Sequence, residues 1–153
     1  MQEMVGTNNA AGLRFAVVAS RFNPEITERL IEGAIGALKS AGCEDANLTL
    51  IRVPGAFEIP LIVHRAAKSR RFDAIVAIGC VIRGETPHFD HISREASHGI
   101  TRASMETGTP IGFGVLTVET DEQAMARSEA GTTNKGFEAA MAAVEMANLL
   151  KQL

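Results

Sequence analysis

Four apolar stretches of the sequence are each followed by a short group of glycine, aromatic and ionisable residues. These groups are Ser20-Arg21-Phe22-Asn23, Pro54-Gly55-Ala56-Phe57-Glu58, Arg83-Gly84-Glu85-Thr86-Pro87-His88, and Glu119-Thr120. Parallel strands present their carboxyl ends along one edge of a sheet, and ligands of open α/β proteins bind beyond that edge. We therefore expect the four groups to form one site for a polar small molecule.

The third group is suited to an anion. Gly84, Glu85 and Thr86 lie in a turn that is expected to open a helix, where free backbone N–H groups and the helix dipole attract phosphate. The alternative is an ordinary helix start, in which Thr86 and Pro87 supply the cap and the first turn. The sequence has neither a Walker loop nor a Gly-x-Gly-x-x-Gly turn after a strand, which argues against nucleoside triphosphates and dinucleotides.

His88 and Glu58 are the candidates for proton transfer and for orienting a polar ligand. The imidazole of a histidine can both donate and accept protons near neutral pH, and His88 lies within the predicted site. The alternatives are a surface histidine and a glutamate that only favours the dipole of the following helix.

Arg127 and Lys135 flank residues 128–134, a segment of small and polar residues that is expected to cap the last helix. Both cations are candidates for binding an anion, and an arginine can contact two phosphate oxygens at once. The alternative is that they only solvate the ends of the neighbouring helices.

A competing metal site would use His91, Glu95 and His98, whose spacing places three possible ligands along one helix face. That face continues into Arg102, whose charge disfavours a bound cation. A solvated face or a contact between subunits is therefore preferred, and no metal is expected.

Composition argues against several other classes of function. The net charge is -3 and the chain has no Trp or Tyr, which disfavours a nucleic-acid partner. The apolar runs are far shorter than the ~18 residues of a membrane span, and residues 1–12 do not follow the plan of a signal peptide, so a cytoplasmic location is expected. The 2 cysteines have no metal-site or disulfide spacing, and Cys80 is interpreted as a packing residue in preference to a nucleophile.

Alternating strands and helices are expected to position these groups. Strands are predicted over Phe15–Ala19, Leu48–Val53, Ala74–Ile82 and Ile111–Val118, because each run is apolar almost without interruption, as in parallel strands covered on both faces. Helices are predicted from a cap at Asn23 to a stop at Gly42, and over Pro60–Lys68, Phe89–Glu106, Asp121–Arg127 and Phe137–Leu150. This order predicts one three-layer α/β domain over residues 14–153, with a four-stranded, doubly wound parallel sheet and helices on both faces.

Two segments indicate contacts between copies of the chain. Residues 1–13 are interpreted as a tail, too polar for the core, that is disordered or pairs with a neighbouring subunit. In the last helix only Glu138, Glu145 and Asn148 are polar, so we expect that helix to be covered on more than one side. A homo-oligomer is therefore predicted.

Several motifs, taken in order, resemble the lumazine synthases of riboflavin biosynthesis. They are Ser20-Arg21-Phe22-Asn23, Pro54-Gly55-Ala56-Phe57-Glu58-Ile59-Pro60, the run from Gly79 to Asp90, and Asn134-Lys135-Gly136 with Glu138-Ala139-Ala140. The similarity runs from about Arg14 to Lys151. Several spaced motifs that coincide over this length are far more specific than any one of them.

The resemblance implies a flavodoxin-like fold and a transferase that needs no cofactor or metal. This enzyme condenses 5-amino-6-(D-ribitylamino)uracil with 3,4-dihydroxy-2-butanone 4-phosphate to 6,7-dimethyl-8-ribityllumazine, with loss of phosphate and water, in the penultimate step of the pathway. The implied contacts with the pyrimidine and ribityl groups come from Phe22, Ala56, Phe57, Glu58, Cys80, Val81, Ile82 and Phe113. The implied phosphate contacts come from Gly84, Glu85, Thr86 and Arg127, with Lys135 nearby and His88 as the proton shuttle.

The resemblance also bears on assembly. It implies that Phe113 and Arg127 reach the site from an adjacent subunit of a pentamer, with riboflavin synthase as a possible partner. Some pentamers of the family assemble as twelve into a 60-subunit shell, and the absence of an insertion before Asn134 and the long tail favour the shell over a pentamer alone. The chain departs from the family pattern at Cys80, where threonine is frequent, and in residues 129–133, which lack a lysine. Two other functions stay open: a carrier of flavin or lumazine without turnover, and a metal-dependent hydrolase that uses His91 and His98.

Overall fold

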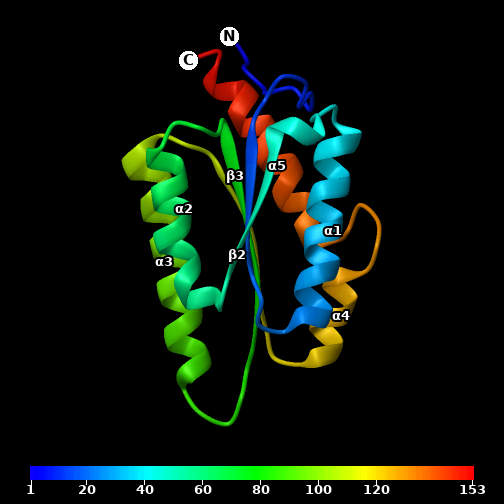
Figure 1. Cartoon of the computed structure of the whole chain (residues 1–153), viewed down its shortest axis with the longest axis vertical. Coiled ribbons are helices and arrows are strands. Elements are labelled where there is room, and N and C mark those ends of the chain that lie inside the picture. Colours follow the sequence, from blue (N-terminus) through cyan, green and yellow to red (C-terminus); the bar gives the residue numbers. More distant parts are fainter.

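A parallel sheet of four strands runs through the centre of the computed structural model, which describes residues 1–153 (Figure 1). The strands are β1 (Phe15–Ser20), β2 (Leu48–Val53), β3 (Ala74–Ile82) and β4 (Ile111–Val118). Their order across the sheet is β2-β1-β3-β4, and every neighbouring pair is parallel. The predicted strands are confirmed, and β1 extends one residue beyond its predicted end.

Helices cover both faces of this sheet, as predicted. They are α1 (Pro24–Ser40), α2 (Ile59–Lys68), α3 (His88–Thr107), α4 (Asp121–Ser128) and α5 (Lys135–Leu150), with short 3-10 turns η1 (Asp45–Asn47) and η2 (Ala56–Glu58). Figure 1 shows α1, α4 and α5 on one face and α2 and α3 on the other. Each face has its own hydrophobic core, so the three-layer α/β arrangement is confirmed. None of the helices is long and apolar enough to cross a membrane.

Strand β2 corrects one prediction. Its continuous apolar run suggested burial on both faces, but β2 is an edge strand on which Thr49, Leu50 and Arg52 are exposed. Arg52 forms an ion pair with Glu28 of α1 along this edge. An exposed edge with charged side chains is how sheets avoid pairing with other chains.

Two helix starts differ in detail from what the sequence suggested. Asn23 is at the N-cap of α1 as predicted, and its carbonyl oxygen accepts the first hydrogen bonds of the helix. Asn23 precedes α1 in a left-handed conformation, with a φ of 54°, and its side chain makes no capping hydrogen bond. Thr86, the cap of the alternative helix start, does not cap α3, because Pro87 occupies the cap position and makes no side-chain capping hydrogen bond. The helix that follows residues 128–134 is capped as expected, by the side chain of Asn134.

Helix α5 packs against both the sheet and α1. Gly136 approaches α1 so closely that a Cβ there would lie 2.0 Å from the carbonyl oxygen of Leu30. This contact accounts within one chain for a second covered side of the apolar helix. Met146 and Leu150 remain exposed on its outer side.

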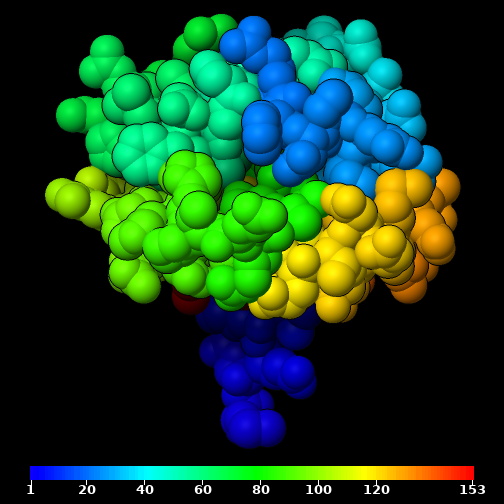
Figure 2. All heavy atoms as spheres, turned by 90° about the horizontal axis from the view of Figure 1, so that it is seen from below, coloured from blue at the N-terminus to red at the C-terminus, as the bar shows by residue number.

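The segment before β1 runs along the end of α5. The side-chain amide of Asn148 donates hydrogen bonds to the carbonyl oxygens of Thr7 and Asn9, at 2.9 and 2.8 Å. Ala10 and Leu13 are buried in the core, which differs from the expectation that residues 1–13 are too polar for it. Figure 2 shows the first residues projecting from the body of the molecule.

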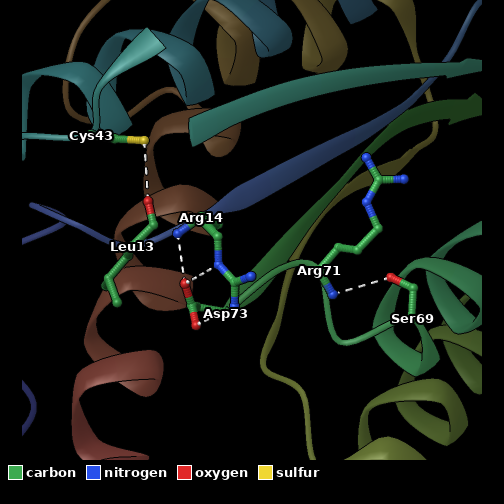
Figure 3. Close-up of polar contacts among 6 residues, drawn as sticks. All are labelled: Leu13, Arg14, Cys43, Ser69, Arg71 and Asp73. Atoms are coloured by element: carbon green, nitrogen blue, oxygen red, sulfur yellow. Dashed lines mark hydrogen bonds and ion pairs between the residues drawn. The ribbon is translucent and has the colours of Figure 1, made fainter. Parts of the chain in front are cut away.

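At the amino-terminal edge of the sheet, an ion pair joins the starts of β1 and β3 (Figure 3). Asp73 accepts hydrogen bonds from the backbone N–H of Arg14 at 2.7 Å and from its guanidinium at 3.3 Å. Nearby, the thiol of Cys43 contacts the carbonyl oxygen of Leu13 at 3.7 Å. These contacts lie at the edge opposite the predicted site.

Candidate active site

The carboxyl ends of β1, β2 and β3 open into a pocket of about 460 Å³. Figure 2 views this edge, where the start of α1, the η2 turn and the loop from β3 to α3 meet. The pocket is lined by Phe22, Gly55, Ala56, Phe57, Glu58, Cys80, Val81, Ile82, Gly84, Thr86, His88, Phe89 and Ile92. Three of the four groups that the sequence singled out therefore meet at one place.

Of the three phenylalanines that line this pocket, two are exposed. Phe22 follows β1 and Phe57 belongs to η2, and they are 68% and 58% exposed. Exposed rings on a mostly apolar lining are unusual in a folded domain unless something covers them. They suit a planar, partly polar ligand, which can stack on an aromatic face.

Phe22 is held in place by the residue that follows it. The side-chain amide of Asn23 donates a 2.9 Å hydrogen bond to the carbonyl oxygen of Cys80 at the end of β3. The carbonyl oxygen of Asn23 accepts hydrogen bonds from the first turn of α1, including the hydroxyl of Thr27 at 3.1 Å. This residue thus connects the segment that carries Phe22 to the strand that forms the floor of the pocket.

The loop from β3 to α3 is fixed by Arg83. Its guanidinium donates to Glu119 at 2.6 Å and to Asp90 at 3.3 and 3.4 Å, and it lies 4.4 Å from the centre of the Phe89 ring. These hydrogen bonds to Glu119 and Asp90 raise the pKa of Arg83. Its backbone N–H also bonds to the carbonyl oxygen of Val118. Arg83 is therefore engaged in holding the loop, and sequence reasoning missed this because its partners lie in other elements.

The pocket contains no lysine or arginine. Apart from the thiol of Cys80, its ionisable side chains are those of Glu58 and His88. Glu85, in the same loop as Gly84 and Thr86, is exposed and does not line the pocket. A phosphate bound here would meet backbone N–H groups and the start of α3 but no cation from the same chain.

The remaining predicted residues form a second concave surface, of about 230 Å³, along β4. Phe113, Arg127 and Lys135 line it together, and none of its lining residues is shared with the first pocket. Phe113 is 47% exposed on this edge strand. Arg127 donates to the carbonyl oxygen of Gln123 at 3.1 Å, and Lys135 pairs with Glu138 at 2.7 Å. The predicted site residues therefore form two separate groups in one chain.

Cys80 is buried at the floor of the pocket. Burial, with a smaller contribution from the charge of Asp121, raises the pKa of its thiol to about 11. A thiol in this state is protonated at neutral pH and is a poor nucleophile. This favours the interpretation of Cys80 as a packing residue.

The possible metal ligands on α3 do not come together. His91, Glu95 and His98 are exposed on the helix, and no three His, Cys, Asp or Glu residues of the chain are grouped so that they could hold a metal ion.

Phe89 and Ile92 are pocket residues that were not among the predicted site residues, although Phe89 lies within the run from Gly79 to Asp90. Ile92 lies four residues after His88, so both are on the same side of the helix. This four-residue spacing could have indicated that Ile92 lies beside the site. Gly55, which the sequence placed only within a motif, also lines the pocket.

The chain is similar to known proteins over nearly its whole length. Residues 12–151 match the model of the family described as 6,7-dimethyl-8-ribityllumazine synthase. Proteins with this name from Chlorobium chlorochromatii and Chlorobaculum tepidum are 48% and 51% identical to the chain over 153 residues, which is 100% of the chain and 99% of each relative. A third, from Syntrophus aciditrophicus, is 50% identical over 144 residues, or 94% of both proteins. The chain therefore belongs to the 6,7-dimethyl-8-ribityllumazine synthase family.

Proposed function

We propose that this chain condenses 5-amino-6-(D-ribitylamino)uracil with 3,4-dihydroxy-2-butanone 4-phosphate to form 6,7-dimethyl-8-ribityllumazine, with release of phosphate and water. The observation that carries the proposal is the pocket of about 460 Å³, in which most of the residues that resemble the family's substrate contacts meet. Family membership supplies the reaction. The geometry supports a separate role for each wall of the pocket.

The pyrimidine substrate binds against the aromatic side of the pocket. Phe22 stacks on the ring, and Val81 and Ile82 lie along its edge at the end of β3. Ala56, Phe57 and Glu58 contact the ribityl chain, whose hydroxyl groups can donate hydrogen bonds to the Glu58 carboxylate.

The phosphate substrate binds at the start of α3. Gly84, Glu85 and Thr86 offer backbone N–H groups there, and the helix dipole adds partial positive charge. A dianion also requires cations, but Arg83 is already paired with two carboxylates. The missing charge comes from a neighbouring copy, from Arg127, which is paired with no carboxylate, and from Lys135, which exchanges its contact with Glu138 for the phosphate.

This requirement makes the protein a homo-oligomer with shared sites. The surface that carries Phe113 and the two cations belongs to the β4 edge, and the adjacent groove between α3 and β4 exposes Met105. A head-to-tail contact would bring this surface of one copy to the pocket of the next, and such contacts close into rings. Family resemblance favours a pentamer, twelve pentamers in a shell, and riboflavin synthase as the partner that consumes the product.

His88 transfers protons during condensation. It lines the pocket on the first turn of α3, beside the residues that hold the phosphate. Most of the rate enhancement comes from holding two substrates together and from stabilising the departing phosphate, and acid–base transfer adds a smaller factor.

The reaction is tested by mixing the two substrates with the purified chain and following lumazine absorbance. Product formation at a rate proportional to enzyme supports the proposal. Tight lumazine binding without any turnover would instead identify a carrier and overturn it.

Shared sites are tested by mixing two inactive chains, His88→Ala and Arg127→Ala, after dissociation. Random reassembly into rings leaves about one quarter of the interfaces with both intact halves, so activity should partly return. Each variant dissociated and reassembled alone is the control. Mixed oligomers that form without recovering activity would show that each site lies within one chain.

A further inference from the structure

Asn134 is a buried polar residue that lines neither the pocket nor the surface along β4. It is 1% exposed and lies where α1, α4 and α5 meet. Its side-chain oxygen accepts hydrogen bonds from the N–H groups of Gly136 and Phe137, at 2.8 and 3.1 Å. Its side-chain nitrogen donates to the carbonyl oxygens of Ser128 and Arg29, at 2.9 and 3.2 Å. The amide therefore uses both of its donors, and its oxygen accepts two bonds.

The two ends of this amide do different things. The oxygen caps α5, a role that serine or aspartate can also fill. The nitrogen connects the start of α5 to the end of α4 and to α1. Of these two sets of bonds, only those of the nitrogen link the three helices to one another.

These bonds lie next to the two cations of the surface along β4. Ser128 directly follows Arg127, and Lys135 directly follows Asn134. Residues 129–133, which join α4 to α5, are all exposed. The buried side chain of Asn134 is therefore bonded directly to the segment that carries Arg127 and adjoins the one that carries Lys135.

Helix α1 is shaped to admit this side chain. A Cβ at Gly33 would lie 2.2 Å from the side-chain oxygen of Asn134, which is impossible without displacement. A Cβ at Gly36, one turn later on the same helix, would have no atom within 4 Å. The absence of a side chain is thus required at one position and not at the other.

We propose that Asn134 is a positioning residue for phosphate binding, because it holds Arg127 and Lys135 at the spacing that a phosphate group needs. The inference rests on the proposed function, in which these cations contact the phosphate of the second substrate. Positioning of this kind affects the substrate that the cations touch and leaves the pyrimidine side of the pocket intact.

Asn134→Ser and Asn134→Asp test the inference, since both keep a capping oxygen and lose the donor. The Michaelis constant of Asn134→Ser for 3,4-dihydroxy-2-butanone 4-phosphate is expected to rise about tenfold, and its constant for the pyrimidine to change less than about twofold. Asn134→Asp should be impaired further, because its second oxygen would face two carbonyl oxygens. Equal increases for both substrates would reduce Asn134 to a structural residue and overturn the inference.

Gly33→Ala and Gly36→Ala form a matched pair that leaves Asn134 itself unchanged and covers the case in which its variants fail to fold. Both add one methyl group to α1, but only Gly33→Ala displaces the amide. Gly33→Ala should therefore reproduce the selective loss for the phosphate substrate, whereas Gly36→Ala should keep wild-type constants. Wild-type kinetics in Gly33→Ala would overturn the inference.

Calorimetric titration of the assembled protein with inorganic phosphate separates this inference from the proposed function, because it needs no turnover. Wild-type protein that forms no lumazine would overturn the proposed function alone. Equal phosphate affinity in wild-type and Gly33→Ala protein would overturn the role of Asn134, whether or not the enzyme is active. Weaker phosphate binding in Gly33→Ala than in Gly36→Ala is the expected result.

Discussion

The side chain of Asn23 donates a 2.9 Å hydrogen bond to the carbonyl oxygen of Cys80, from a residue whose backbone is left-handed, with a φ of 54°. Asparagine tolerates this conformation better than most residues. The bond connects two walls of the pocket, one carrying Phe22 and the other formed by the end of β3. One side-chain amide thus joins the segment that carries Phe22 to the end of β3.

Asn23→Gly should raise the Michaelis constant for the pyrimidine substrate about tenfold, because glycine keeps the left-handed backbone and removes only the amide. Steady-state kinetics with each substrate varied in turn measures the effect. Arg70→Gly is the control, since Arg70 is the other non-glycine residue at positive φ, 59°, and follows α2 far from the pocket. An unchanged constant in Asn23→Gly would show that Phe22 is positioned without this bond.

His88→Ala should lower the turnover number by about 10²-fold to 10⁴-fold while the protein stays folded, because one group that transfers protons is lost. His91→Ala is the matched control, as His91 is exposed on the same helix and does not line the pocket. Product formation at saturating substrate is measured, after subtraction of the uncatalysed reaction. A wild-type turnover number would remove His88 from the mechanism.

Arg127→Ala should raise the Michaelis constant for the phosphate substrate at least tenfold, since it removes a charge-assisted contact. The Michaelis constant for the pyrimidine substrate should rise much less. Arg65→Ala removes an exposed cation from α2 and should leave both constants unchanged. If Arg127→Ala shifts both constants equally, Arg127 supports the fold and does not bind phosphate.

Cys80→Ser should change the turnover number less than about threefold, because a buried thiol with a pKa of about 11 is not a nucleophile at neutral pH. Iodoacetamide at pH 8 should likewise leave the folded enzyme active. A loss of activity of about 10³-fold or more in Cys80→Ser would give the thiol a chemical role.

Asp73→Asn should lower the free energy of unfolding by about 1 kcal/mol at pH 7. Burial of Asp73 raises the pKa of its carboxyl group, but the hydrogen bonds from Arg14 outweigh burial and hold the pKa below its ordinary value of 3.8. The ionised carboxylate therefore stabilises the fold above about pH 4, and this contribution is lost as the pH falls through the lowered pKa.

Denaturant unfolding between pH 3 and pH 7 measures this dependence. The difference between wild type and Asp73→Asn should shrink as the solution becomes acidic. Ser69→Ala removes two neutral hydrogen bonds at the same edge, one of which is drawn in Figure 3, so the difference that it causes should not vary with pH. A constant difference for Asp73→Asn would refute the assigned role of the ion pair.

Most of the fold could be predicted from the sequence because long apolar runs separated by helical patterns leave few alternatives. The exposure of β2 could not be predicted, because its apolar run resembles that of β3. Only the order of the strands shows that β2 lies at the edge of the sheet. The left-handed Asn23 was missed because its partner, Cys80, lies 57 residues away. Local patterns contain no information on such pairs.

The pocket itself was predictable, since the carboxyl ends of parallel strands meet at one edge. The pairing of Arg83 with Glu119 could not be predicted, because it depends on how the neighbouring strands β3 and β4 are aligned. Only the resemblance indicated that Phe113 and Arg127 lie on a different surface of the chain from His88. Hydrophobic periodicity does not show on which side of an edge strand a later helix will pack.

The two separate binding surfaces of each chain have a genetic consequence under the shared-site arrangement. A chain contributes its pocket to one site and its β4 surface to another, so a lesion in either surface disables one site and a lesion in both disables two. Two alleles damaged in different surfaces should complement each other when expressed together. An allele damaged in both should interfere with a normal copy, and the severity of its effect should follow gene dosage.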